Sequence, residues 1–154
     1  MVVWRIVRPA HAANPLSGTG AARYGNRWNS VGHPVGYTST SRSLAVLEVL
    51  VHVTRDDIPF DAALIPIDVP DRLVTEAETL PAHWSNSSHL AETRRVGDLW
   101  VHSQISLAML VPSAVIPAER NLLINPRHPL FNRVEIGQPE PNAFDRRLFE
   151  IKRA

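Results

Sequence analysis

The chain has 154 residues, of which 44% are hydrophobic, and its formal net charge is +1. This length and composition predict one folded domain, residues 1–154, whose core needs no covalent staple. The absence of cysteine excludes disulfide bonds and thiolate metal sites, and no metal is expected. No apolar run reaches the roughly eighteen residues of a membrane span and no secretory leader is recognisable, so we expect a cytoplasmic protein without a membrane partner.

Basic and acidic residues are distributed unevenly along the chain. Residues 1–47 contain five arginines and neither aspartate nor glutamate, so Glu48 is the first carboxylate. An acid-free basic segment suits an anionic ligand. Beyond Glu48, acidic residues are interleaved with arginines, and the small net charge argues against a nucleic-acid-binding surface.

The first forty residues predict two strands separated by a long loop. Residues 2–8 are short and rich in β-branched side chains, which predicts a strand, and residues 36–40 predict a second one. Residues 9–34 are rich in Gly, Pro, Asn and Ser and predict an ordered loop with a brief extended piece near Arg27–Trp28. Because a loop of this length in a compact domain is usually functional or disordered, its Arg, Tyr and Trp residues favour function.

The clearest predicted helix follows the second strand. Ser41 predicts its N-cap, and the apolar residues within 43–53 form a wide arc that predicts a largely buried helix. Glu48, His52 and Arg55 fall at positions i, i+4 and i+7, which predicts one narrow polar stripe along it.

The remaining elements predict an α+β protein. Residues 63–69 predict a strand in which Pro66 indicates an edge or a bulge, and Ser87 or Ser88 predicts the cap of a second helix over about 89–104. Strands and helices alternate without a regular βαβ rhythm, which indicates a single compact α+β domain. Further short extended pieces are predicted at 73–75, at 107–117 with a hinge at Pro112–Ser113, from 121, at 134–136 and at 148–151.

Three separated blocks of the sequence resemble the RES domain family, named for an arginine, a glutamate and a serine. Arg23 in GAARYGNRWNSVG matches the arginine of the first block, Glu48 in YTSTSRSLAVLE matches the glutamate, and Ser113 in VPSAVIPAERNLLINPRHP matches the serine. FDRRLF at 144–149 is similar to the family's ending. Asn26 stands where the family usually has glycine, and asparagine tolerates the positive φ of such a turn.

The resemblance implies an ADP-ribosyltransferase-like fold, with a mixed sheet core and flanking helices, that binds NAD in a cleft. It implies the toxin of a bacterial toxin–antitoxin pair, with NAD as the substrate. It also implies a cognate Xre-like helix-turn-helix antitoxin that blocks the active site, so nucleic acid would be contacted only through the antitoxin. A homo-oligomer is left open.

The chemistry that the resemblance implies assigns roles to the matched residues. Cleavage of the nicotinamide–ribose bond passes through an oxocarbenium-like state, so the site must bind a pyrophosphate and place negative charge near the cation. Glu48 and Arg23 are the predicted catalytic residues. Arg23 and Arg27 are expected to bind phosphate oxygens, and Tyr24 and Tyr37 to stack on the nicotinamide or ribose with a hydroxyl left for hydrogen bonding.

Several of these residues also have an ordinary structural interpretation. Ser39 and Ser113 are expected to contact phosphate or to hold neighbouring side chains, and His52 either orients Glu48 or is structural. An arginine can cap a loop carbonyl, a tyrosine can pack half-buried, and Trp28 is assigned to the core.

Three functions are compatible with the sequence. With water or inorganic phosphate as the acceptor the chain is an NAD glycohydrolase or phosphorylase that depletes cellular NAD, which we favour. With a protein side chain as the acceptor it is a mono-ADP-ribosyltransferase. The alternative of another class is a non-catalytic module that binds nucleic acid or protein.

Overall fold

A mixed β-sheet forms the centre of the computed structural model, which describes residues 1–141 and 144–149. Its strands are β1 (Val2–Val7), β2 (Gly36–Ser39), β3 (Ala63–Asp68), β4 (Val74–Glu76), β5 (Ala108–Pro112), β6 (Arg120–Ile124), β7 (Glu135–Ile136) and β8 (Glu140–Pro141). Seven of them follow the order β4-β5-β6-β2-β1-β3-β7, and β8 also pairs with β3. Strands β4 and β5 run parallel, whereas the other pairs within the described residues are antiparallel.

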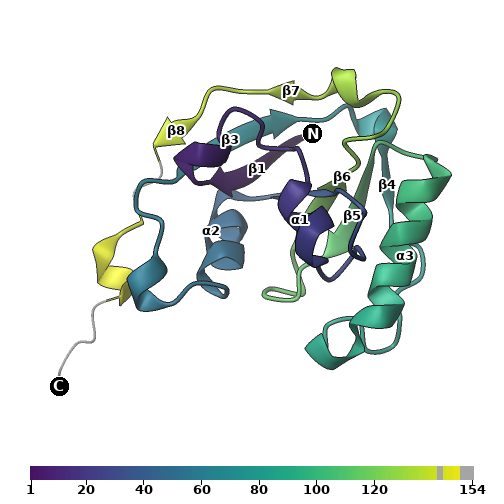
Figure 1. The fold of residues 1–154 in the computed structure, drawn as a ribbon, viewed down its shortest axis with the longest axis horizontal. Helices are drawn as coiled ribbons and strands as arrows, with labels where there is room; N and C mark the ends of the chain where they lie inside the picture. The colour runs from purple at the N-terminus through teal and green to yellow at the C-terminus, as the bar shows by residue number, and fades with distance from the viewer. Residues whose placement is uncertain (142–143, 150–154) are drawn as a thin grey trace.

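Helices flank this sheet (Figure 1). They are α1 (Thr19–Tyr24), α2 (Arg42–Leu50) and α3 (Leu90–Ser103). Short 3-10 turns are η1 (Pro9–His11), η2 (Arg55–Asp57), η3 (Asp71–Leu73), η4 (Ser87–His89), η5 (Phe131–Arg133) and η6 (Arg146–Phe149). The predicted α+β class and the mixed sheet with flanking helices are confirmed. Within the described part of the chain, no helix is long and apolar enough to cross a membrane.

Helices α2 and α3 lie on the same face of the sheet. The strand register places Asn121 opposite both Ser39 and Val111, so these three side chains share one face. Helix α3 packs on this face because its Trp100 clusters with Val111. Helix α2 packs against β1 and β2, and its Glu48 is hydrogen-bonded to Asn121.

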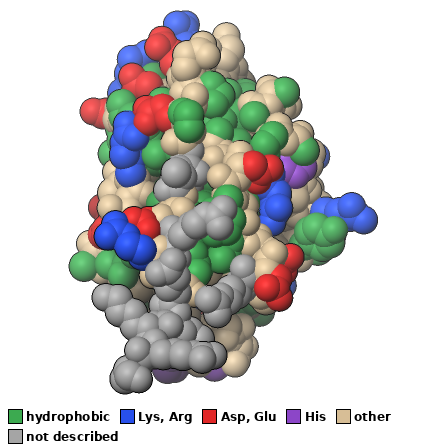
Figure 2. Space-filling view, turned by 90° about the vertical axis from the view of Figure 1, so that its left-hand side faces the viewer, with side chains coloured by type: hydrophobic (Ala, Val, Ile, Leu, Met, Phe, Trp, Pro, Cys, Tyr) green, Lys and Arg blue, Asp and Glu red, His purple; other side chains and the backbone are tan. Residues whose placement is uncertain are grey.

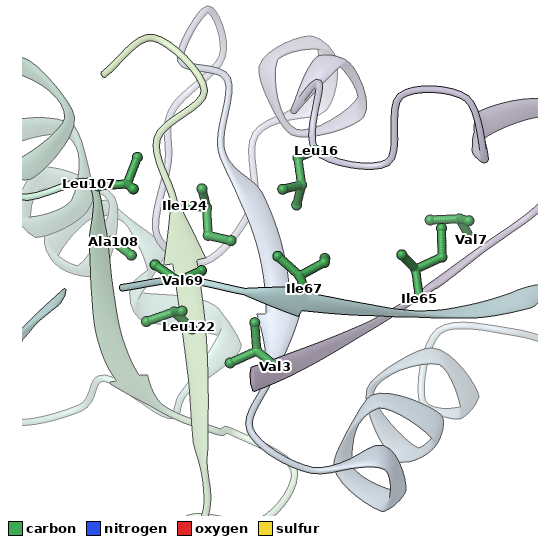
Figure 3. Close-up of a cluster of buried hydrophobic side chains, with 10 residues drawn as sticks. All are labelled: Val3, Val7, Leu16, Ile65, Ile67, Val69, Leu107, Ala108, Leu122 and Ile124. Carbon is green, nitrogen blue, oxygen red and sulfur yellow. The ribbon is translucent and has the colours of Figure 1, made fainter. Parts of the chain in front are cut away.

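The opposite face of the sheet buries the larger hydrophobic cluster (Figure 3). Its members come from β1, β3, β5, β6 and the connections beside them, and Leu16 from the segment before α1 covers the strands. They are Val3, Val7, Leu16, Ile65, Ile67, Val69, Leu107, Ala108, Leu122 and Ile124. Each larger apolar side chain buried in this way contributes roughly 1.5–3 kcal/mol, so this face anchors the sheet. On the side where β8 lies, acidic, basic and apolar side chains are intermingled, in keeping with the small net charge (Figure 2).

The prediction of a loop without a helix over residues 9–34 is wrong, because this segment contains α1. The helix lies between Gly18 and Gly25, its N-cap and C-cap residues, and both glycines have positive φ, 65° and 68°. Six residues are too few to show a helical period in the sequence. The extended piece predicted at Arg27–Trp28 is the turn of a single antiparallel bridge between Asn26 and Asn29.

The N-terminus of α2 is as predicted, but its C-terminus is not. The Ser41 hydroxyl accepts the N–H of Leu44 at 3.1 Å, which confirms the N-cap. The helix ends at Leu50, so His52 and Arg55 lie beyond it and the predicted polar stripe does not form. Valines at alternate positions near the end of the segment lower its helix propensity, and tertiary packing does not extend it.

Helix α2 is also less buried than its apolar composition predicts. Only Leu44 and Ala45 are fully buried among its residues, and Val51 after its end is 55% exposed. One flank of α2 faces a cleft, which explains why apolar side chains such as Val49 remain partly accessible.

The middle of the chain agrees with its predicted elements except at one cap. β3 and α3 form as predicted. On the outer side of β3, β8 pairs with its first residues and β7 with its last, and Pro66 lies between these two pairings. The Pro66 carbonyl accepts the N–H of Gly137. Neither predicted serine caps α3: its N-cap position is His89, whose side chain makes no capping hydrogen bond, and the 3-10 turn before α3 is capped by Asn86. The Asn86 side-chain oxygen accepts the N–H of Ser88 at 2.9 Å and begins η4, which leads into α3.

Near the C-terminus the predicted extended pieces are only partly present. A single strand, β5, replaces the two predicted within 107–117, because the chain turns at Ser113. The piece predicted at 148–151 begins in η6, a 3-10 turn, and its last two residues lie outside the described residues. β4, β6 and β7 form where extended pieces were predicted.

Gly97 of α3 lies in close contact with the backbone of Trp28. A Cβ atom built on Gly97 would lie 1.7 Å from the backbone oxygen of Trp28, so α3 approaches this loop closer than any side chain allows. We expect Gly97→Ala to lower the free energy of unfolding by about 1–3 kcal/mol, although alanine is ordinarily the better helix former. Thermal or urea unfolding measures the change.

The matched control is Gly20→Ala in α1, where no heavy atom of the described chain lies within 4 Å of the added Cβ. Its expected effect is a gain of roughly 0.4–1 kcal/mol, because alanine restricts the unfolded chain. Equal effects of the two substitutions would contradict the close contact.

Candidate active site

The sheet is split between β1 and β2. β1 pairs with β3 at six positions from Val2 to Val7, but its register with β2 is a single pair, Trp4 and Ser39. Arg5 crosses the gap, and its Nη1 donates to the backbone oxygen of Tyr37 at 2.5 Å. A cleft of about 800 Å³ opens here, which is within the size range of small-molecule sites.

The cleft is lined from both sides of the split and from both helices. α2 and the residues after it form one wall, and the loop at 25–28 with the segment at 85–94 forms the other. Strand ends and the turn after β5 form its floor. Its ionisable lining residues are Arg5, Arg27, Tyr37, Glu48, His52 and Arg94. Among the described residues, no group of three or more His, Asp or Glu side chains is arranged to hold a metal ion.

Glu48 is held through one of its two carboxylate oxygens. The Ser113 hydroxyl donates to Oε1 at 2.8 Å, and the Asn121 amide donates to the same oxygen at 2.5 Å. Asn121 is itself held, because the Ser39 hydroxyl donates to its Oδ1 at 2.8 Å. Oε2 of Glu48 has no hydrogen-bond partner within residues 1–141 and 144–149, so it remains an acceptor for a ligand.

Both predicted serines hold neighbouring groups. The Ser113 hydroxyl is buried and accepts the N–H groups of Val115 and Ile116, each at 3.0 Å, while donating to Glu48. It therefore links the turn after β5 to the carboxylate. Ser39 lines the cleft, but its hydroxyl hydrogen is directed to Asn121. Their predicted phosphate contacts stay predictions.

Tyr37 fixes the loop that forms the second wall of the cleft. Its hydroxyl accepts the N–H of Trp28 at 3.1 Å and donates to Oδ1 of Asn29 at 2.8 Å. Burial raises the pKa of Tyr37 above the ordinary value. The hydroxyl is thus engaged within the protein, although the side chain lines the cleft. Trp28, assigned to the core from the sequence, is 2% exposed.

Arg27 and Arg94 join this loop to the segment that leads into α3. Nη1 of Arg27 donates to the backbone oxygen of Trp84 at 2.7 Å, and Nε of Arg94 donates to that of Asn26 at 2.9 Å. Arg27 thus caps a loop carbonyl and lines the cleft at the same time. Each guanidinium retains further donors, because an arginine carries five N–H groups.

Arg23 and Tyr24 lie at the end of α1, outside the residues that line the cleft. Tyr24 is 70% exposed, and the guanidinium of Arg23 stacks over its ring at 5.2 Å. The turn from Gly25 to Arg27 separates them from the Arg27 side chain. Their predicted roles in catalysis and NAD binding stay predictions.

Two site residues were missed by the sequence analysis, Arg5 and Asn121. Arg5 is half-buried as a whole, but its Nε is fully buried and has no hydrogen-bond partner among the described residues. Desolvation by burial lowers the pKa of the Arg5 guanidinium, and no carboxylate of the described residues forms a salt bridge with it. A signal was present, because a charged or amide side chain inside an apolar strand such as VVWRIV or RNLLI needs a specific partner.

The fold and the cleft define an α+β domain built on a mixed sheet with flanking helices, as predicted. A family model described as RES domain matches residues 2–145, and the chain belongs to this family. The extent of the domain to residue 154 stays a prediction.

Relatives in three bacteria are similar over most of their length. "Toxin Res" of Pseudomonas putida is 42% identical over 154 residues, covering 97% of this chain and all of that protein. "Toxin Res" of Photorhabdus laumondii is 41% identical over 128 residues, 82% of each chain. "Prs ADP-ribosylating toxin" of Sphingobium sp. is 41% identical over 152 residues, 94% of each chain.

A solved structure supports the fold. The Mycobacterium tuberculosis MbcT–MbcA toxin–antitoxin complex contains a chain that matches with a TM-score of 0.74 and 21% identity. The match covers 92% of this chain and 84% of that one. At this identity the likeness establishes the arrangement of the elements.

Proposed function

We propose that this chain is a toxin of a bacterial toxin–antitoxin pair that binds NAD in the cleft and cleaves its nicotinamide–ribose bond, depleting cellular NAD. The observation that carries the proposal is that two groups line the same cleft. One is Arg5, whose buried Nε has no hydrogen-bond partner among the described residues, and the other is Glu48, which keeps one carboxylate oxygen free to accept a hydrogen bond. Access to NAD places the protein in the bacterial cytoplasm.

The arginines of the cleft support the proposal that the chain binds NAD. No carboxylate of the described residues forms a salt bridge with Arg5, Arg27 or Arg94. A buried guanidinium is stabilised when an anion supplies the missing hydrogen bonds, and the dianionic pyrophosphate of NAD fits a guanidinium fork. We therefore assign Arg5, with Arg27, to the pyrophosphate, whereas Arg23 and Tyr24 lie outside the residues that line the cleft.

Glu48 is the group that we assign to cleavage of the nicotinamide–ribose bond. As the C1′–N bond breaks, its electron pair leaves with nicotinamide, and positive charge develops on the ribose. A carboxylate close to the ribose stabilises that charge, and Oε2 of Glu48 can accept a hydrogen bond from a ribose hydroxyl at the same time. Water or inorganic phosphate then bonds to C1′ and loses a proton to solvent. The Tyr37 ring lines the same cleft, which supports the proposal that it stacks on the nicotinamide or ribose.

A second function is favoured by a specific observation. The Sphingobium relative, 41% identical over 94% of this chain, is named an ADP-ribosylating toxin. The same cleavage with a protein side chain as the acceptor would make this chain a mono-ADP-ribosyltransferase. Both functions share the binding groups and Glu48 and differ only in what bonds to C1′.

The proposal includes a protein partner. The structural neighbour with a TM-score of 0.74 was solved as a toxin–antitoxin complex, which supports a cognate antitoxin for this chain. We propose an Xre-like helix-turn-helix protein that covers the cleft and blocks access to Arg5 and Glu48.

Glu48→Gln tests the chemistry. The glutamine oxygen can accept the bonds from Ser113 and Asn121, so the fold is retained while the negative charge is lost. We expect kcat for nicotinamide release from NAD to fall by about 10²–10³, because the charge acts electrostatically. Purified proteins are compared by chromatography of nicotinamide, and the product formed with water, phosphate or cell extract identifies the acceptor.

The matched control is Glu135→Gln, in exposed strand β7, which removes the same charge and should leave kcat unchanged. A wild-type protein that releases no nicotinamide with any of the three acceptors would contradict the proposed function. Equal rates in the wild type and Glu48→Gln would contradict the role of the carboxylate.

Arg5→Met tests the role of Arg5 in NAD binding, in a Glu48→Gln background where NAD should be consumed about 10²–10³-fold more slowly. We expect NAD to raise the melting temperature of Glu48→Gln but not of the double variant, because a lost charge-assisted hydrogen bond weakens binding by about 1.5–3 kcal/mol. Arg133→Met, at an exposed arginine of η5, is the matched control. An equal rise in both backgrounds would exclude Arg5 from the NAD site.

Co-expression tests the partner. Expression of the chain alone should arrest bacterial growth, whereas Glu48→Gln should not, and co-expression with its helix-turn-helix antitoxin should restore growth. The purified complex should release nicotinamide at least about tenfold more slowly than the free toxin, since a blocked cleft excludes NAD. A complex as active as the free chain would contradict a partner that covers the cleft.

A further inference from the structure

We infer that Asn121 is a positioning residue that directs the Glu48 carboxylate, and that Ser39 sets the direction of the Asn121 amide. The inference rests on the proposed function for its catalytic meaning, but not for its geometry. Asn121 donates to Oε1 of Glu48, and Ser39 donates to Oδ1 of Asn121. Two donors on Oε1 leave Oε2 as the oxygen that meets the ribose.

The direction of the amide follows from the donors and acceptors present. An asparagine side chain has a donor end and an acceptor end, whereas an ionised carboxylate only accepts. If the Asn121 amide were turned over, its oxygen would face Oε1 of Glu48 at 2.5 Å, and two acceptors would repel each other. The Ser39 hydroxyl stabilises the observed direction because it donates to Oδ1.

The backbone makes this arrangement rigid. Ser39 and Asn121 are directly opposite in the antiparallel pair of β2 and β6, and Ser39 is also the β2 partner of Trp4 in the single β1–β2 pair. α2, which carries Glu48, begins three residues after Ser39. Its Ser41 cap donates a hydrogen bond of 2.8 Å to Glu119 beside β6. Helix and strand are therefore held to the same end of β2.

An aspartate at position 121 distinguishes positioning from packing, because it has the same shape but no donor. One of its oxygens would face Oε1 of Glu48, and two adjacent carboxylates cannot both ionise readily. The other charged groups of the cleft are unchanged: Arg5 on β1, Arg27 on the loop, Arg94 on α3 and His52 after α2. The Ser113 hydroxyl remains as the second donor.

The experiment titrates the side-chain carboxyl carbons by ¹³C NMR in the free protein without NAD, with the Glu48 signal assigned by its loss in Glu48→Gln. In Asn121→Asp we expect the Glu48 carboxyl to take up its proton at a pH higher by at least about one unit than in the wild type. Asn132→Asp, at an exposed position of η5, adds the same charge and should leave the titration unchanged.

Asn121→Ala is the second variant, and it tests the positioning of Glu48 by itself if Asn121→Asp does not fold. It removes one donor from the charged form of Glu48, so the midpoint should also move to higher pH, by less than in Asn121→Asp. A Glu48 titration identical to that of the wild type in the folded variants would overturn the inference.

Kinetics then separate this inference from the proposed function. Asn121→Ala should lower kcat for nicotinamide release by about 10–10² with little change in KM, since a misdirected carboxylate weakens only the transition state. In Asn121→Asp the acid limb of the pH–kcat profile should move with the NMR midpoint. A moved midpoint in a chain whose wild type releases no nicotinamide would leave the positioning intact and refute the proposed function.

Discussion

The separation of β1 from β2 is the constraint on which the rest of the site depends. Two central strands that part after one residue pair leave backbone groups unsatisfied, and these must find other partners. Arg5 provides one by donating to the carbonyl of Tyr37, which also fixes the guanidinium at the opening. The same split creates the volume of the cleft. A continuous sheet would have no room for a ligand and no reason to place an arginine among buried apolar residues.

The second wall of the cleft, formed by the loop at 25–28, is held by close contacts on two sides. Gly97 lets α3 touch the backbone of Trp28, and the Tyr37 hydroxyl binds Trp28 and Asn29 from the sheet side. The loop that carries Arg27 is therefore held between a helix and a strand. A long polar segment that would otherwise be mobile becomes part of a preorganised site, which lowers the entropy lost when a ligand binds.

The sequence allowed the class of fold, the Ser41 cap and most strands of the sheet to be predicted, because each depends on local pattern. The family motif singled out Glu48, whose role in catalysis stays a prediction. Helix α1 was missed since six residues show no period. The end of α2 was misplaced because packing, not composition, decides where a helix stops. Arg5 and Asn121 were missed because their importance arises only when β1, β2 and β6 are brought together, and no spacing along the chain indicates that pairing.

The charges of the cleft explain why several hydrogen bonds within the protein orient Arg5 and Glu48. Arg5 and Glu48 line one cavity without forming a salt bridge with each other, so neither charge neutralises the other. Such an arrangement lowers the stability of the free protein, because a desolvated cation and a half-satisfied carboxylate are both unfavourable. Under the proposed function, these two charges suit a substrate that is anionic at its pyrophosphate and becomes cationic at its ribose, because the arginine binds the first charge and the carboxylate stabilises the second.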